Sequence, residues 1–131
     1  MLEGGCHCGA VRYKVEGEPA RAGLCHCRDC QGHTGAPVVG WAIFKQDQVE
    51  IEGALSTYES SSEGRRQFCP RCGTSIFYLN DVIFPGLIDV QIATLDDPDA
   101  VQPKEQIQLA DRIGWMQSAH DLPGFERWPP E

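Results

Sequence analysis

Cysteine and histidine residues gather in three short clusters of this sequence, and thiolates and imidazoles are ligands that zinc binds well. The chain has seven cysteines and four histidines. The clusters read Cys6-His7-Cys8, Cys25-His26-Cys27-Arg28-Asp29-Cys30 and Cys69-Pro70-Arg71-Cys72-Gly73. An odd number of cysteines does not fit a fully paired disulfide framework, so we expect metal binding or thiol chemistry instead.

The first and third clusters together supply the four thiols of one closed site. Cys6 and Cys8 are two residues apart, and in an extended segment both would point to the same side. Cys69 and Cys72 form a Cys-x-x-Cys-Gly turn, where Gly73 accepts a positive φ and leaves backbone N–H groups facing the sulfurs. Four thiolates complete the zinc tetrahedron, and one ion would clip a long loop in a small domain. We predict a structural zinc on these four cysteines.

The second cluster places three thiols, those of Cys25, Cys27 and Cys30, within six residues. A zinc ion held only by them has a vacant fourth position, which is where zinc chemistry takes place. Three thiolates make zinc a weak generator of hydroxide and favour a soft fourth ligand, such as a substrate thiol. A metal-bound thiol loses its proton at neutral pH. We therefore predict a second, catalytic zinc, and two zinc ions per chain.

The residues leave other interpretations of these clusters open. The Cys69/Cys72 or Cys27/Cys30 pair could be redox-active, and the four thiols of the first site could be buried apolar groups. The second site could also be closed by a fourth protein ligand; the candidates are His33, His26 and Asp29. His33 could equally be an acid or base near an open position, or a solvated loop residue.

Composition favours one small domain, residues 1–131, that does not bind nucleic acid. The chain is 41% hydrophobic and has a net charge of −8. A phosphate backbone would be repelled unless a basic patch intervened, and Arg65-Arg66 is the one adjacent basic pair. We expect that pair in a solvated loop or at a strand edge. The start of the sequence does not resemble a leader and no apolar run suggests a membrane span, so we expect a cytoplasmic protein.

Short apolar or alternating segments between glycines and prolines indicate a β-rich fold that must position these cysteines. Expected strands are residues 10–15, 38–44, 48–52, 75–79 and 87–93. We also predict a short helix that follows Cys27 and runs through Asp29 to Thr34, and one helical turn over residues 97–101. The tail from Gln102 is expected to pack as an irregular cover.

The order of these motifs resembles the glutathione-dependent formaldehyde-activating enzyme family, also called Gfa-like or centromere protein V-like. The resemblance rests on Gly5-Cys6-His7-Cys8-Gly9, on Cys25-His26-Cys27-x-x-Cys30 with Thr34-Gly35, and on Phe68-Cys69-Pro70-x-Cys72-Gly73. Later parts of the chain are also similar to the family's carboxyl-terminal pattern: residues 94–98, Gln106-Ile107, Trp115 and residues 121–123.

The resemblance implies a mainly β, Mss4-like fold with small zinc-bound antiparallel sheets and few short helices. It implies structural zinc on Cys6, Cys8, Cys69 and Cys72, and catalytic zinc on Cys25, Cys27 and Cys30. The implied activity joins glutathione sulfur to formaldehyde, giving S-hydroxymethylglutathione, the reverse of a carbon–sulfur lyase reaction. The implied partners are a small thiol such as glutathione and a small aldehyde.

Two other functions stay possible on the sequence alone: a zinc-stabilised binding module, and a thiol or redox sensor without formaldehyde activity. No cationic pair with obvious spacing marks the two carboxylates of glutathione. Arg28, Arg65 and Arg66 are the candidates for that role.

Overall fold

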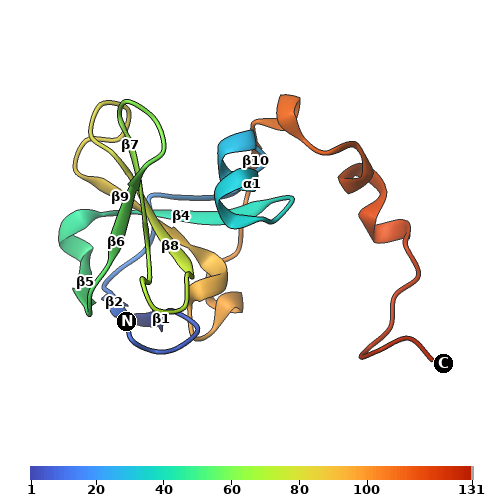
Figure 1. Cartoon of the computed structure of the whole chain (residues 1–131), viewed down its shortest axis with the longest axis horizontal. Helices are drawn as coiled ribbons and strands as arrows, with labels where there is room; N and C mark the ends of the chain where they lie inside the picture. The colour runs from blue at the N-terminus through green and yellow to red at the C-terminus, as the bar shows by residue number, and fades with distance from the viewer. Residues whose placement is uncertain (131) are drawn as a thin grey trace.

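The computed structural model describes residues 1–130, which form two β-sheets with one short α-helix (Figure 1). The strands are β1 (Leu2–Gly5), β2 (Arg12–Val15), β3 (Arg21–Cys25), β4 (Val39–Lys45), β5 (Val49–Glu52), β6 (Ser56–Glu59), β7 (Gly64–Phe68), β8 (Ser75–Asn80), β9 (Leu87–Gln91) and β10 (Gln106–Ile107). The helix is α1 (Arg28–Thr34), and the 3-10 turns are η1 (Gln46–Gln48), η2 (Ile92–Thr94), η3 (Pro98–Ala100), η4 (Leu109–Asp111) and η5 (Gly114–Asp121). The expectation of a mainly β fold with short helices is confirmed.

The two sheets differ in size and share no strand. The smaller has the order β1-β2-β5, and the larger has the order β10-β3-β4-β9-β8-β7-β6. Neighbouring strands are antiparallel except β10, which runs parallel to β3 at one edge of the larger sheet. The expectation of antiparallel sheets therefore holds for all ladders of residues 1–130 but this one.

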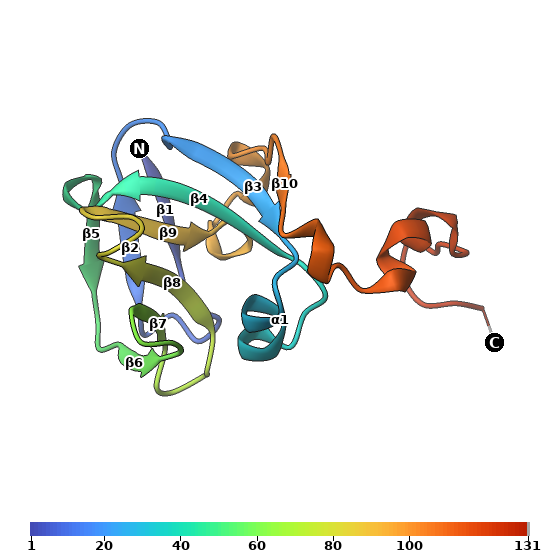
Figure 2. The same cartoon turned by 90° about the horizontal axis from the view of Figure 1, so that it is seen from above.

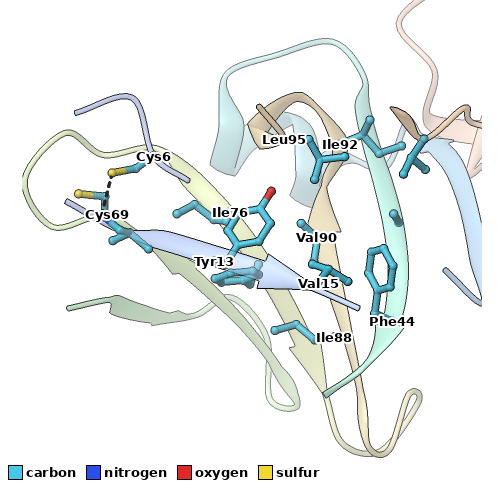
Figure 3. Close-up of a cluster of buried hydrophobic side chains, with 14 residues drawn as sticks. Cys6, Tyr13, Val15, Phe44, Cys69, Ile76, Ile88, Val90, Ile92 and Leu95 are labelled. Atoms are coloured by element: carbon cyan, nitrogen blue, oxygen red, sulfur yellow. Dashed lines mark hydrogen bonds between the residues drawn. The ribbon is translucent and has the colours of Figure 1, made fainter. Parts of the chain in front are cut away.

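The core lies between the two sheets. Phe44 of β4 and Val90 of β9 point from the larger sheet toward Tyr13 and Val15 of β2, and all four side chains are buried (Figure 3). The rings of Tyr13 and Phe77 meet edge to face, with their centroids 5.3 Å apart. Period-two alternation along β4 and β9 produces this apolar face and leaves the opposite face of the larger sheet for other side chains.

That opposite face carries a row of residues that are in register across four strands. Arg66 of β7 pairs with Tyr78 of β8, Tyr78 with Asp89 of β9, and Asp89 with Ile43 of β4. Residues that face each other across antiparallel ladders project to the same side of the sheet. The row therefore lies away from the core and, as described below, lines a cavity.

The five strands predicted from the sequence are confirmed as β2, β4, β5, β8 and β9, with ends shifted by a few residues. The predicted helix is α1, which begins directly after Cys27 as expected, and the predicted helical turn is η3, capped by Asp97. No helix within residues 1–130 is long and apolar enough to cross a membrane.

Beyond Asp111 the tail leads away from the sheets, so the expectation that it covers the domain is wrong for that part (Figures 1 and 2). Its first part is tied in, because β10 pairs with β3 and Asp111 accepts hydrogen bonds from Arg28 N and Gln31 Nε2 of α1. Beyond it, large apolar side chains stay in solvent, with Trp115 59% and Trp128 90% exposed. Prolines and polar residues dominate its end, so that segment buries little apolar area.

Candidate metal centres and the adjoining cavity

The structure brings Cys6, Cys8, Cys69 and Cys72 together, with all four sulfur atoms within 4.8 Å of one another. Each pair occupies the turn of a β-hairpin. Cys6 and Cys8 lie between β1 and β2 of the smaller sheet, and Cys69 and Cys72 lie between β7 and β8 of the larger sheet. The first pair was expected just ahead of the first strand in an extended segment; β1 precedes it, and the pair sits in a turn.

Backbone geometry in both turns suits metal-bound sulfur. Val11 N lies 3.2 Å from Cys6 Sγ, and Arg71 N lies 3.4 Å from Cys69 Sγ. Gly9 and Gly73, which follow the second cysteine of each pair, both have a φ of +82°. A Cβ at either glycine would meet no neighbouring atom within 4 Å, so the left-handed φ, and not lack of space, explains the residue.

The donor set of this first site fits a divalent cation. Four thiols this close cannot all ionise alone, because each thiolate repels the next. Hydrogen bonding from Thr74 lowers the pKa of Cys72 to about 5, whereas the pKa of Cys8 is raised to about 11, since burial and the three neighbouring thiols outweigh the amide of Ala10. A cation would relieve that competition and let all four bind as thiolates.

Cys25, Cys27 and Cys30 form the second cluster, and their sulfurs also lie within 4.8 Å of one another. Cys25 ends β3, Cys27 is the N-cap of α1, and Cys30 lies in the first turn of that helix. The Cys27 sulfur accepts a hydrogen bond from Cys30 N at 3.2 Å, and the sulfurs of Cys25 and Cys30 are 3.7 Å apart. The end of β3 and the start of α1 thus place three thiols close enough to bind one ion.

Electrostatics at the second cluster also require a cation for full ionisation. Hydrogen bonding from Cys25 is the main cause that lowers the pKa of Cys30 to about 5, with help from the Arg66 charge. The same contact with Cys30, together with burial, raises the pKa of Cys25 well above its usual range, and burial raises that of Cys27. Unaided, the trio favours a single thiolate; three thiolates need a positive ion among them.

Within residues 1–130, none of the three candidate fourth ligands joins the three-cysteine cluster. His26 is 2% exposed, and its Nε2 lies 2.8 Å from Gln106 Oε1, so it anchors β10. His33 is half-buried in α1, its Nδ1 lies 3.2 Å from Ser75 Oγ, and its ring stacks on Tyr58. It is therefore not a solvated loop residue. Asp29 is exposed.

A cavity of about 710 Å³ adjoins the three cysteines, all of which line it. Its apolar wall comes from Trp41, Ile43, Ile83, Phe84 and Ile107. Its charged side chains are those of Arg21, Arg28, Arg66, Asp29, Asp89, Glu105 and Asp111. Apolar walls with a few polar groups beside a reactive cluster are typical of a small-molecule site.

The three arginines suggested for glutathione lie in different surroundings. Arg28 is exposed, hydrogen-bonds Gln31 and lines the cavity. Arg65 pairs with Asp81 on the surface, with 2.8 Å between Nη2 and Oδ2. Arg66 is 4% exposed and lines the cavity, so the expectation of a solvated position is wrong for it. A strand leading into Cys69 would have predicted that one of the two adjacent arginines points inward.

Asp89 is a charged cavity residue that the sequence motifs did not single out. It lies between buried Ile88 and Val90 of β9 and points to the cavity side of the sheet. Burial is the main cause that raises the pKa of its carboxyl to about 7, with a contribution from a Cys30 thiolate. The signal in the sequence was one acidic residue between the apolar residues Ile88 and Val90.

Comparison with known proteins agrees with these features. A sequence model of the family "glutathione-dependent formaldehyde-activating enzyme" matches residues 1–111. A Halomonas elongata protein named as a putative glutathione-dependent formaldehyde-activating enzyme is 33% identical over 120 residues, covering 83% of this chain and 74% of the relative. An uncharacterized lyase of Schizosaccharomyces pombe is 28% identical over 111 residues, covering 74% of this chain and 81% of the relative.

Solved structures show the same fold. A crystal structure of a Rhodobacter sphaeroides protein superimposes with a TM-score of 0.63 and 27% sequence identity, covering 79% of this chain and 98% of the other. The matched region of the family model contains both cysteine clusters and ends at the last cavity residue, Asp111. On this evidence the chain belongs to the glutathione-dependent formaldehyde-activating enzyme family.

Proposed function

We propose that this chain is a zinc-dependent carbon–sulfur lyase that joins or releases a small aldehyde and a thiol, with glutathione and formaldehyde as the pair. The observation that carries the proposal is the convergence of Cys25, Cys27 and Cys30 on the wall of a cavity of about 710 Å³. Family membership supports the substrates, since the family and a 33% identical relative are named for that pair. Residues 1–131 would act as one zinc-binding domain.

The two clusters would hold two zinc ions with different roles. Cys6, Cys8, Cys69 and Cys72 supply four sulfurs and would hold a structural ion that ties the two sheets. Zinc on Cys25, Cys27 and Cys30 would supply the positive charge that keeps a fourth, substrate thiol ionised at neutral pH. The three cysteines leave room for that thiol because none of the candidate protein ligands in the described part of the chain reaches them.

Side chains of the cavity would then position the aldehyde and manage the proton. The sulfur forms a bond to the aldehyde carbon, and the carbonyl π electrons move to oxygen, which takes one proton. Asp89 can donate that proton because burial raises its pKa to about 7, and it recovers one released by the incoming thiol. In the reverse direction the Asp89 carboxylate accepts the hydroxyl proton as the carbon–sulfur bond breaks.

The remaining lining residues fit a small polar ligand in an apolar enclosure. Trp41 and Phe84 exclude water from the reacting atoms, and exclusion of water strengthens electrostatic contacts inside the site. Arg28 lies at the exposed part of the lining, where its guanidinium can reach a carboxylate of a tripeptide. Arg21 is engaged by Glu105 and is less available for that purpose.

The test is exchange spectroscopy by NMR on an equilibrium mixture of glutathione, formaldehyde and their adduct. Zinc-loaded protein at catalytic concentration should increase the exchange rate between free and adduct glutathione, and Cys27→Ser protein should not. The spontaneous reaction is already fast, so the comparison with Cys27→Ser provides the background. An unchanged exchange rate with wild-type protein of measured zinc content would overturn the activity and favour a zinc-stabilised binding module.

A further inference from the structure

Arg66 is a cation buried in the wall of the cavity. It lies in the middle of β7 and is only 4% exposed. Removing a charged group from water is unfavourable unless the charge is paired. A guanidinium held here by the sheet therefore needs a negative partner close by.

No carboxylate within residues 1–130 forms an ion pair with Arg66. Its Nε lies 3.1 Å from Ser60 Oγ, and its Cζ lies 4.8 Å from the centre of the Tyr78 ring. A hydroxyl and a ring face stabilise a cation without neutralising it. Asp89 lines the same cavity but stays beyond ion-pair distance.

The sulfur of Cys30 is the group in contact with Arg66 that can carry a negative charge. Arg66 Nη1 lies 3.6 Å from Cys30 Sγ, close enough for an N–H···S hydrogen bond. The contact joins β7 to α1, and its two residues are 36 positions apart in the sequence. It therefore results from the tertiary fold and not from the conformation of a short segment. Hydrogen bonds between ionised partners are roughly twice as strong as neutral ones.

We propose that Arg66 is the counter-charge of the three-cysteine metal centre and sets its affinity for metal and for a fourth thiolate. A divalent ion with three thiolates carries a charge of −1, and a substrate thiolate makes it −2. With the positive charge of Arg66 included, these totals become 0 and −1. The substrate thiolate therefore enters a centre that has no net charge. Arg66 acts here as a positioning residue through Cys30; the identity of the thiol alone rests on the proposed function.

Three variants separate charge from packing. Arg66→Met removes the cation, keeps much of the volume and leaves a thioether against the Tyr78 ring. Arg66→Lys restores the charge without the planar fork of donors. Arg65→Met is the matched control, because Arg65 is the next residue of β7 but pairs with Asp81 at the surface. Removing one partner of a buried contact destabilises a fold, so circular dichroism checks each variant, and Arg66→Lys keeps the comparison possible if Arg66→Met does not fold.

The measurement is competition of each metal-free protein, refolded with Zn²⁺ or Co²⁺, against a chromophoric chelator. Wild-type protein should show two dissociation constants. We expect Arg66→Met to weaken the weaker site by about 10- to 100-fold, the effect usual for outer-shell partners of metal sites. The tighter site should be unchanged, Arg65→Met should match wild type, and Arg66→Lys should recover part of the loss.

A second readout is glutathione titration of the Co²⁺-loaded proteins, followed by the sulfur-to-cobalt charge-transfer absorption. The thiol-dependent increase should shift to higher glutathione concentration in Arg66→Met. Unchanged metal and thiol affinities in that variant, equal weakening of both metal sites, or a single metal site in wild-type protein would each overturn the proposal. These readouts do not use formaldehyde. The role of Arg66 can therefore be confirmed even if wild-type protein fails the exchange assay, and it can fail even if the exchange assay succeeds.

Discussion

The sulfurs of Cys8 and Cys69 lie 3.8 Å apart although they belong to hairpins of different sheets. The first hairpin is part of the three-stranded sheet and the second is part of the seven-stranded sheet. A metal ion bound between them would fix one sheet against the other at one end of the core (Figure 3). The expected role of this site is therefore stability.

We predict that Cys69→Ser abolishes cooperative unfolding of the zinc-purified protein. Structural zinc contributes on the order of 10 kcal/mol in small zinc domains, which is comparable to the whole stability of such a domain. Thermal unfolding followed by circular dichroism measures the effect, and chelation of both metals from wild-type protein should give the same result. A Cys69→Ser protein that melts cooperatively near the wild-type temperature would contradict the structural role.

We predict that Cys27→Ser, in contrast, leaves the fold intact and removes one metal ion. Cys27 is the N-cap of α1, and serine is a good N-cap residue that can accept the same hydrogen bond from Cys30 N. The helix should therefore keep its start while the soft third ligand is lost. Metal analysis should find one zinc per chain in place of two, with a melting temperature within a few degrees of wild type. Loss of folding would show instead that both clusters are structural.

The sequence predicted both sulfur clusters because ligand type and spacing are local properties. Cysteines two or three residues apart can share an ion whatever surrounds them, and Gly73 needs its left-handed φ within the same turn. Strands such as β4 and β9 were also predictable, since β4 is rich in β-branched and aromatic residues and β9 alternates Ile88 and Val90 with other residues. Each turn and strand is thus a local feature, whereas the meeting of the Cys6/Cys8 turn with the Cys69/Cys72 turn joins distant segments and was inferred from the four ligands that zinc requires.

Other elements could not be predicted because their reasons are not local. β3 reads Arg-Ala-Gly-Leu-Cys and β1 reads Leu-Glu-Gly-Gly, both poor in β-forming residues; each is a strand because neighbouring strands pair with it. The placement of Arg66 and Asp89 on the cavity face follows from the register of β7, β8 and β9. The sequence alone favoured a solvated position for the adjacent pair Arg65-Arg66, and only this register shows that Arg66 is buried.

We predict that Asp89→Asn removes a pH-dependent loss of stability. The pKa of Asp89 is raised to about 7 in the folded chain, against an ordinary carboxyl value of 3.8. Between those values the folded protein keeps a proton that the unfolded chain has released, so wild-type stability falls as pH rises toward 7 and then levels off. In urea unfolding of the zinc-loaded proteins from pH 5.5 to 8, the free energy of unfolding of Asp89→Asn should increase relative to that of wild type as pH rises.

The charged groups that share this environment are Arg66 and Cys30, and both are unchanged in the variant. The difference between the two proteins therefore reports Asp89 itself. A difference that is flat with pH, or that shrinks as pH rises, would contradict the raised pKa. In the exchange assay, Asp89→Asn should be slow at every pH, whereas wild-type activity in the adduct-forming direction should decline above pH 7 as the proton donor ionises.

We predict opposite effects of alanine at two glycines that have equal room for it. A Cβ at Gly73 or at Gly32 would meet no neighbouring atom within 4 Å, so neither substitution causes a clash. Gly73 has a φ of +82°, and a left-handed conformation costs an L-residue about 1–2 kcal/mol. Gly32 lies exposed inside α1 with ordinary helical φ, where alanine is favoured by about 1 kcal/mol. Denaturant unfolding of the zinc-loaded variants should therefore show Gly73→Ala destabilised and Gly32→Ala stabilised. If both changed stability in the same direction, backbone conformation would not be the reason for glycine after Cys72.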